Sequence, residues 1–177
     1  MAELNCINGN LTANDATAQN PVGGTWTIYH PTQGVKKYIY LQADDAFTQY
    51  GVGVISESGL KAETVAATTL CQMPIMAMAT LTDEYFGWFQ YEGLTAGGRA
   101  VIGTNICYSI ASGSVVLMSV ATQLIVGYTG NASQFVGFMM AYDAMTGATL
   151  DSGVSVITYS TMRVFLRGEK GCAKSTD

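Results

Sequence analysis

Two acidic pairs are the residues of this sequence best suited to chemistry. Asp44–Asp45 and Asp83–Glu84 each place two carboxylates side by side, the residue type that a glycosidase or a calcium site requires. Adjacent residues on a strand point in opposite directions, so neither pair converges on one ligand by itself. Both pairs border aromatic segments, as loop residues do, and charged side chains are exposed by default. We therefore expect solvated loops at both pairs.

The histidine and the cysteines are weaker candidates for a catalytic or metal site than the acidic pairs. His30 is the single histidine, so a two-histidine metal site is excluded, and it has no nucleophile context around it. The four cysteines are widely separated and form no C-x-x-C motif: Cys6, Cys71, Cys107 and Cys172. Two disulfides are arithmetically possible, but "MAELNCINGN" lacks the basic and apolar regions of a secretory signal, which favours a reducing compartment. Phosphate-loop and dinucleotide motifs are also missing, and we expect no enzymatic activity, no metal and no cofactor.

Charge and hydropathy exclude two further classes of function. The net charge of -5 argues against general nucleic-acid binding, which requires a basic face to replace phosphate counterions. The most apolar run, residues 115–128, is too short to span a membrane and contains Gln123. We expect neither nucleic acid nor membrane among the partners.

The elements that must carry these residues are short strands. Only 12% of the residues are charged, while Gly, Thr, Val and aromatic residues are frequent, which is typical of an all-β protein. Turns with glycine separate the apolar runs at the spacing of a sandwich or barrel. Residues 62–71 are compatible with a short helix or a loop, and residues 75–81 with a strand. We predict a polar, extended N-terminal arm over residues 1–34, and one β-sandwich or β-barrel domain over residues 35–177.

One predicted strand is aromatic on both faces. In "EYFGWFQYEG", residues 84–93, alternation places Tyr85, Phe89 and Tyr91 on one face and Phe86 and Trp88 on the other. One face must pack in the core of the domain. Two covers remain open for the other face: a second layer of the same chain, or a neighbouring subunit.

The middle of the chain is nearly free of charge. Residues 93–142 contain one charged side chain, Arg99, so several outer faces are expected to be dry and covered by other subunits. We expect a homo-oligomer, most simply a trimer. The aromatic residues assigned to its subunit interface are Phe86, Trp88, Tyr128, Phe135 and Phe138.

The order of segments resembles a known family. "YFGWFQYEG", then "GGRAVIGTNICYSIASGSV", then "LIVGYTG" or "FVGFMM" is similar to the pattern of the small proteins that decorate, or cement, the capsids of tailed bacteriophages. The resemblance covers residues 50–142. It implies a β-tulip-like barrel or sandwich that binds the major capsid protein on the outer surface of the virion, commonly as trimers, and reinforces the shell. Such a protein is assembled in the host cytoplasm.

Two segments are the candidates for contact with the shell. The arm contributes Leu4, Ile7 and Leu11, through an extended chain that can add to a partner's sheet edge. The C-terminal segment "TMRVFLRGEK" contributes Arg163, Arg167 and Lys170, and the two arginines are expected on the outer face of its strand. For these basic residues two interpretations stay open: a solvated edge strand, or pairing with acidic groups of the capsid protein or of an adjacent subunit.

Two other functions compete with capsid decoration. The first is a receptor- or glycan-binding module of a phage fibre or tail, in which Trp26, Trp88 and Tyr128 stack on sugars. The second is a subunit of the shell or tail tube itself.

Overall fold

Strands alone form the described part of this chain. The computed structural model describes residues 10–56, 60–64, 72–102, 109–110, 112–113, 115–118, 123, 125–127, 139–146 and 158–168. No helix occurs within these ranges. The strands join into a twelve-stranded sheet and a separate two-stranded pair, and five strands of the sheet close on themselves. The all-β prediction, with a barrel as one of its two forms, is confirmed.

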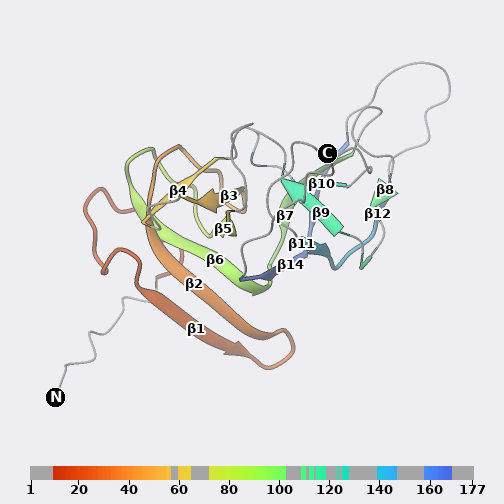
Figure 1. The fold of residues 1–177 in the computed structure, drawn as a ribbon, viewed down its shortest axis with the longest axis horizontal. Helices are drawn as coiled ribbons and strands as arrows, with labels where there is room; N and C mark the ends of the chain where they lie inside the picture. The colour runs from red at the N-terminus through yellow and green to blue at the C-terminus, as the bar shows by residue number, and fades with distance from the viewer. Residues whose placement is uncertain are drawn as a thin grey trace, which may run out of the picture.

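The closed barrel occupies the N-terminal half of the chain and the left of Figure 1. Its strands are β2 (Gly34–Ala43), β3 (Val52–Ile55), β4 (Lys61–Glu63), β5 (Pro74–Ala77) and β6 (Phe86–Leu94). They pair in the order β2-β4-β3-β5-β6, and β6 returns to β2. All of these pairings are antiparallel except β2 with β4. Closure removes the free edges that an open sheet would leave.

The barrel interior is filled by alternate residues of its strands. This barrel cluster is apolar throughout and consists of Leu41, Ala43, Phe47, Ile55, Ala62, Ile75, Ala77, Ala79, Leu81 and Phe89. Phe47 and Phe89 meet edge to face, with ring centroids 5.3 Å apart, a favoured geometry for aromatic pairs. Small residues make room for the rings: a Cβ added at Gly53 would lie 2.7 Å from the Phe47 ring.

A second cluster covers the outside of the barrel over β2 and β6. Its buried members are Tyr38, Tyr40 and Trp88, and Trp88 is 0% exposed. The cover comes from β1 (Thr25–His30), which pairs antiparallel with β2 and contributes Trp26 and Ile28. Residues of the same chain therefore cover the second aromatic face of β6. We call this group the outer aromatic cluster; its half-buried members are Leu11, Trp26, Ile28, Met78 and Phe86.

The N-terminal segment differs from the expected separate arm over residues 10–34. Asp15 exchanges two backbone hydrogen bonds with Phe86, of 2.9 and 2.8 Å. The Tyr40 hydroxyl donates to Asp15 Oδ2 at 2.8 Å and accepts from the Gln19 N–H at 3.2 Å. The boundary expected at residue 34 falls where β2 begins, inside the β1–β2 hairpin. The polar composition was a poor guide here because backbone hydrogen bonds, one carboxylate and a few apolar side chains such as Leu11 and Trp26 are enough to hold the segment. Residues 1–9 lie outside the described ranges.

The strands of the C-terminal half lie on the right of Figure 1 and continue the sheet from β6. They are β7 (Gly98–Ile102), β8 (Ser109–Ile110), β9 (Val115–Met118), β10 (Ile125–Gly127), β11 (Met139–Ala141), β12 (Met145–Thr146), β13 (Thr158–Met162) and β14 (Val164–Arg167). Their order in the sheet is β6-β14-β11-β9-β10-β7-β13, and the chain passes from β13 through Arg163 into β14. β12 and β8 pair separately.

Gln123 joins the two halves. Its side-chain amide donates to the Ala46 carbonyl at 2.6 Å, and its Oε1 accepts from the Thr48 N–H at 3.0 Å. Its own carbonyl accepts from the Val52 N–H at 3.2 Å. Gln123 holds a φ of 55°, which aims these groups at the loop between β2 and β3.

Two local predictions are refined by the strands. Residues 75–81 form a strand only in part, because β5 ends at Ala77. The segment predicted as helix or loop begins with β4, while residues 65–71 lie outside the described ranges.

Candidate functional site

The outer face of β11 and β14 is exposed and apolar. In β14, Val164 and Leu166 are buried while Phe165 and Arg167 are exposed, as the predicted alternation requires. In β11 the middle residue, Met140, points outward and lies directly opposite Phe165 in the ladder. Met140 is 39% exposed, Phe165 44% and Tyr142 52%. We call Met140, Tyr142, Arg163, Phe165 and Arg167 together the β11–β14 face.

Arg163 forms the polar border of this face. It lies between β13 and β14, and its guanidinium donates two hydrogen bonds to the Asp143 carboxylate, from Nε to Oδ2 at 2.9 Å and from Nη2 to Oδ1 at 2.6 Å. The Arg163 backbone N–H also donates to Oδ2, at 3.0 Å. The guanidinium carbon lies 4.6 Å from the centre of the Tyr142 ring, within the range of a cation–π contact. Bidentate pairing fixes the orientation of the arginine as well as its position.

The charges of this pair stabilise each other. The side-chain hydrogen bonds from Arg163, and then its backbone N–H, hold the pKa of Asp143 below its ordinary value. The hydrogen bond to Asp143 likewise raises the pKa of Arg163. Both side chains are about one-third exposed or more, so the pair contributes orientation more than stability. Chemically, the face can bind an apolar or aromatic surface that carries acidic groups.

The two open interpretations of the basic strand are changed by these contacts. β14 is not an edge strand, because it pairs with β11 on one side and β6 on the other. Arg163 is already paired within its own chain, while Arg167 is exposed and lies opposite Glu92 in the ladder. The edge was mispredicted because one sequence run divides at Arg163 into two strands with different neighbours. Lys170 lies outside the described ranges.

Of the five aromatic residues predicted to form a subunit interface, two lie in the described part of the chain, and both pack within their own chain. Trp88 is completely buried in the outer aromatic cluster, and Phe86 is half-buried there, with its ring stacked 6.3 Å from Tyr40. Both are therefore used by the fold of their own chain. Tyr128, Phe135 and Phe138 lie outside the described ranges.

Of the arm residues predicted to contact the capsid, one lies within the described ranges and two lie outside them. Leu11 is half-buried and packs against the outer aromatic cluster. Leu4 and Ile7 lie outside the described ranges. Among the described residues, no contact brings Leu11 together with Arg163 or Arg167.

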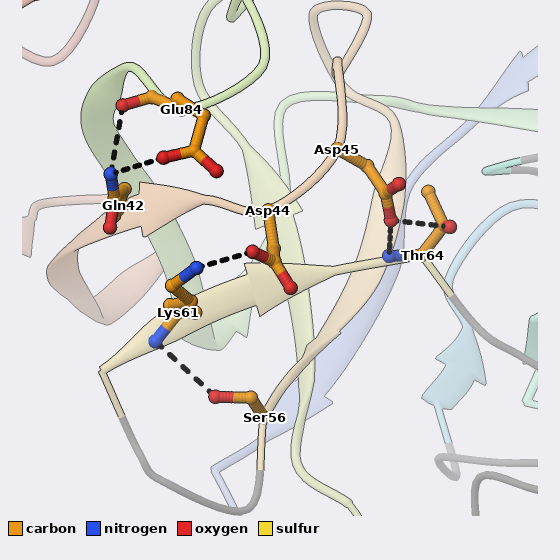
Figure 2. A network of polar contacts seen from close by, with 7 residues as sticks. All are labelled: Gln42, Asp44, Asp45, Ser56, Lys61, Thr64 and Glu84. Atoms are coloured by element: carbon orange, nitrogen blue, oxygen red, sulfur yellow. Dashed lines mark hydrogen bonds and ion pairs between the residues drawn. The ribbon is translucent and has the colours of Figure 1, made fainter.

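Figure 2 shows three of the four residues of the acidic pairs, Asp44, Asp45 and Glu84, and the carboxylates of Asp44 and Asp45 point to different partners. Asp44 pairs with Lys61, while Asp45 Oδ2 accepts from the Thr64 N–H at 2.9 Å and hydroxyl at 2.7 Å. Glu84 accepts from the Gln42 side-chain amide, 3.1 Å from its Oε2. Asp44, Asp45 and Glu84 each have their own protein partner, and the hydrogen bond to Asp44 raises the pKa of Lys61. Among the described residues no group of three or more acidic, His or Cys side chains could hold a metal ion.

His30 has a structural environment. Its Nδ1 accepts from the Thr32 N–H at 3.3 Å, within the turn that joins β1 to β2. Gly34 follows with a φ of 75°, which completes the turn with a left-handed residue. The four cysteines all lie outside the described ranges.

Sequence reasoning missed Met140, Tyr142 and Asp143. Their signal is present in "MMAYD", where Met140 and Tyr142 alternate with Met139 and Ala141. The run is short and uncharged until its end, so nothing in the sequence alone shows which of the two faces is exposed. The pairing of β11 with β14 supplies that information.

Comparison with known proteins gives no relative. No protein family, no curated protein and no solved structure matches this chain. Within the described residues, no helix is long and apolar enough to cross a membrane.

Proposed function

We propose that this chain is a non-enzymatic structural protein of a phage virion, which binds the outer surface of the capsid and stabilises the shell. The β11–β14 face is the observation that carries the proposal. Met140 and Phe165 are exposed on strands that are paired on both sides, with Tyr142 exposed just after β11, so another chain can cover all three without any change in the fold. The resemblance of residues 50–142 to capsid decoration proteins supplies the partner.

The contact would combine hydrophobic burial with an acidic partner. Covering half-exposed Met140, Tyr142 and Phe165 contributes about 1 kcal/mol for each side chain. Arg167 supplies a positive charge at the border, where an acidic group of the capsid protein can pair with it. The trimer expected from the nearly uncharged segment 93–142 is part of this proposal and would bring several such faces to the shell at once.

Co-sedimentation with capsids tests the proposal. Shells of the phage that carries this chain, stripped of the protein, are mixed with wild type and with the double variant Met140→Ala/Phe165→Ala. We expect the double variant to fold and to lose about tenfold or more in shell affinity, from roughly 2 kcal/mol of lost burial. Leu60→Ala is the matched control, because Leu60 is 50% exposed on the barrel, away from the face. Equal occupancy of shells by all three proteins would contradict the proposal.

The glycan-binding alternative has less support. It relies on tryptophan rings that can stack on sugars, but Trp88 is fully buried and Trp26 packs on it with ring centroids 6.0 Å apart. Its third candidate, Tyr128, lies outside the described ranges. Capsid decoration is therefore our first proposal.

A further inference from the structure

Strand β1 has an open outer edge. Among the described strands β1 pairs with β2 alone, and it stands at one end of the strand order. Figure 1 shows it as the outermost strand of the barrel half, with β2 on its inner side only. One row of its backbone groups therefore has no partner strand in the described part of the chain.

The hydrogen-bond pattern identifies that row. The Tyr40 N–H donates to the Gly24 carbonyl at 2.9 Å, and residues facing each other in an antiparallel ladder alternate between bonded and non-bonded pairs. From Gly24 onward, the even-numbered residues of β1 consequently bond to β2. Thr25, Thr27 and Tyr29 direct their N–H and C=O groups outward, and their side chains are exposed, Tyr29 to 73%.

This edge carries none of the usual protection against pairing. Natural edge strands are commonly blunted by lysine, proline or a bulge. β1 reads TWTIYH, with no acidic or basic residue other than His30, no proline and an unbroken register with β2. Its β-branched and aromatic residues favour the extended state. Pro21 and Pro31 lie outside the two ends and limit the length of a ladder.

We propose that β1 pairs antiparallel with β1 of a second copy of this chain. The outward groups are symmetric about Thr27, so a two-fold axis there places Thr27 opposite Thr27 and Thr25 opposite Tyr29. The three facing pairs exchange about six backbone hydrogen bonds. No like charges meet, because the nearest cation across the hairpin, Lys37, is paired with Glu92 at 2.8 Å.

A second copy suits the edge better than an unrelated strand. A neutral edge offers no charge by which to select a foreign partner, whereas an identical strand matches it in length and in outward groups. This contact is separate from the β11–β14 face and does not depend on the proposed capsid function. Pairing through β1 doubles the mass of any oligomer that forms through other surfaces of the chain.

The first test is Thr27→Pro, measured by analytical ultracentrifugation over a range of concentrations. The Thr27 N–H points outward, so proline removes no bond between β1 and β2, and proline is tolerated on edge strands. We expect the assembly of the variant to have half the mass of the wild-type assembly at high concentration. The same mass for both proteins at every concentration would overturn the proposal.

The second test uses charge and remains decisive where the proline variant does not fold. Thr27→Lys and Thr27→Glu each place like charges across the two-fold axis, so each alone should show the halved mass. Mixing the two should restore the full mass, because opposite charges then face each other. Val35→Lys adds the same charge on β2, away from the edge, and should behave as wild type. Full mass for either single variant alone, or no recovery on mixing, would rule out this pairing.

Discussion

The Tyr40 hydroxyl is a buried side-chain link between the N-terminal segment and the barrel, in addition to the backbone hydrogen bonds there. Tyr40 is 0% exposed, its hydroxyl bonds to Asp15 and Gln19, and its ring packs 5.2 Å from Trp88. Tyr40→Phe keeps the ring and removes only the hydroxyl. Residues 10–24 should then bind the barrel less tightly, while the barrel cluster stays intact.

The expected loss follows from the two bonds. A hydrogen bond to a charged group is worth about 1.5–3 kcal/mol. Asp15 is only half-buried and Gln19 is exposed, so water replaces part of what the hydroxyl supplied. We expect the free energy of unfolding to fall by about 1–2 kcal/mol at pH 7.

The same hydroxyl predicts a pH dependence. Burial, together with the nearby Asp15 carboxylate, raises the pKa of Tyr40 to about 12. The unfolded chain releases this proton near pH 10, so the folded state binds it more tightly. The stabilisation is therefore complete below about pH 10 and is lost as the pH rises toward 12. The difference is at most about 2.7 kcal/mol, and partial exposure of Asp15 reduces it to about 1 kcal/mol.

Urea denaturation followed by far-ultraviolet circular dichroism measures both effects. Stability of wild type and Tyr40→Phe is compared at pH 7 and in steps from pH 9 to 11.5. The difference in the free energy of unfolding between wild type and Tyr40→Phe should become smaller as the pH rises. Tyr29→Phe is the control, since Tyr29 is 73% exposed and its loss of a hydroxyl should change nothing. A constant gap over the alkaline range would refute the role given to Tyr40.

Three further predictions concern other contacts. Gly53→Ala should lower the urea midpoint with an unchanged m-value, a loss of about 1–3 kcal/mol, because the new Cβ would lie 2.7 Å from the Phe47 ring; an unchanged midpoint would argue against tight packing there. Gln123→Ala should increase hydrogen exchange at the Thr48 N–H, which loses its acceptor at 3.0 Å, and equal exchange rates would contradict the tie between the halves. Arg163→Gln should raise the pKa of Asp143 toward its ordinary value in an NMR titration. Because the folded state lowers this pKa, the ionised carboxylate stabilises the fold at neutral pH, and wild type should lose that stabilisation as the pH falls through the pKa of folded Asp143. An unchanged pKa of Asp143 in the variant would show that Arg163 does not cause the shift.

Local sequence patterns predicted which segments form strands better than they predicted which segments pack against each strand. Alternation in residues 84–93 correctly separated Phe89, in the barrel cluster, from Trp88, in the outer aromatic cluster. It left the cover of Trp88 open, because a pattern within one strand carries no information about what packs on it. The cover came from β1, across the β1–β2 hairpin, whose pairing the sequence analysis did not predict.

The candidate site was predicted only in part for the same reason. The alternation of Val164, Phe165 and Leu166 gave the correct outward face. The partners of that face, Met140 on β11 and Asp143 beyond it, lie twenty or more residues away in sequence, and only the ladder between β11 and β14 brings them there. Long-range pairing of this kind depends on the whole topology, which no short segment specifies.

The position of the two tryptophans has a practical consequence. Trp26 and Trp88 are the only tryptophans of the chain, and both lie in the outer aromatic cluster. Fluorescence excited selectively in tryptophan therefore reports on the barrel half alone and gives no signal from the strands β7 to β14. Emission at short wavelength, with little quenching of Trp88 by acrylamide, is expected as long as the barrel is closed. Unfolding curves from fluorescence and from circular dichroism will coincide only when the two halves unfold as one cooperative unit.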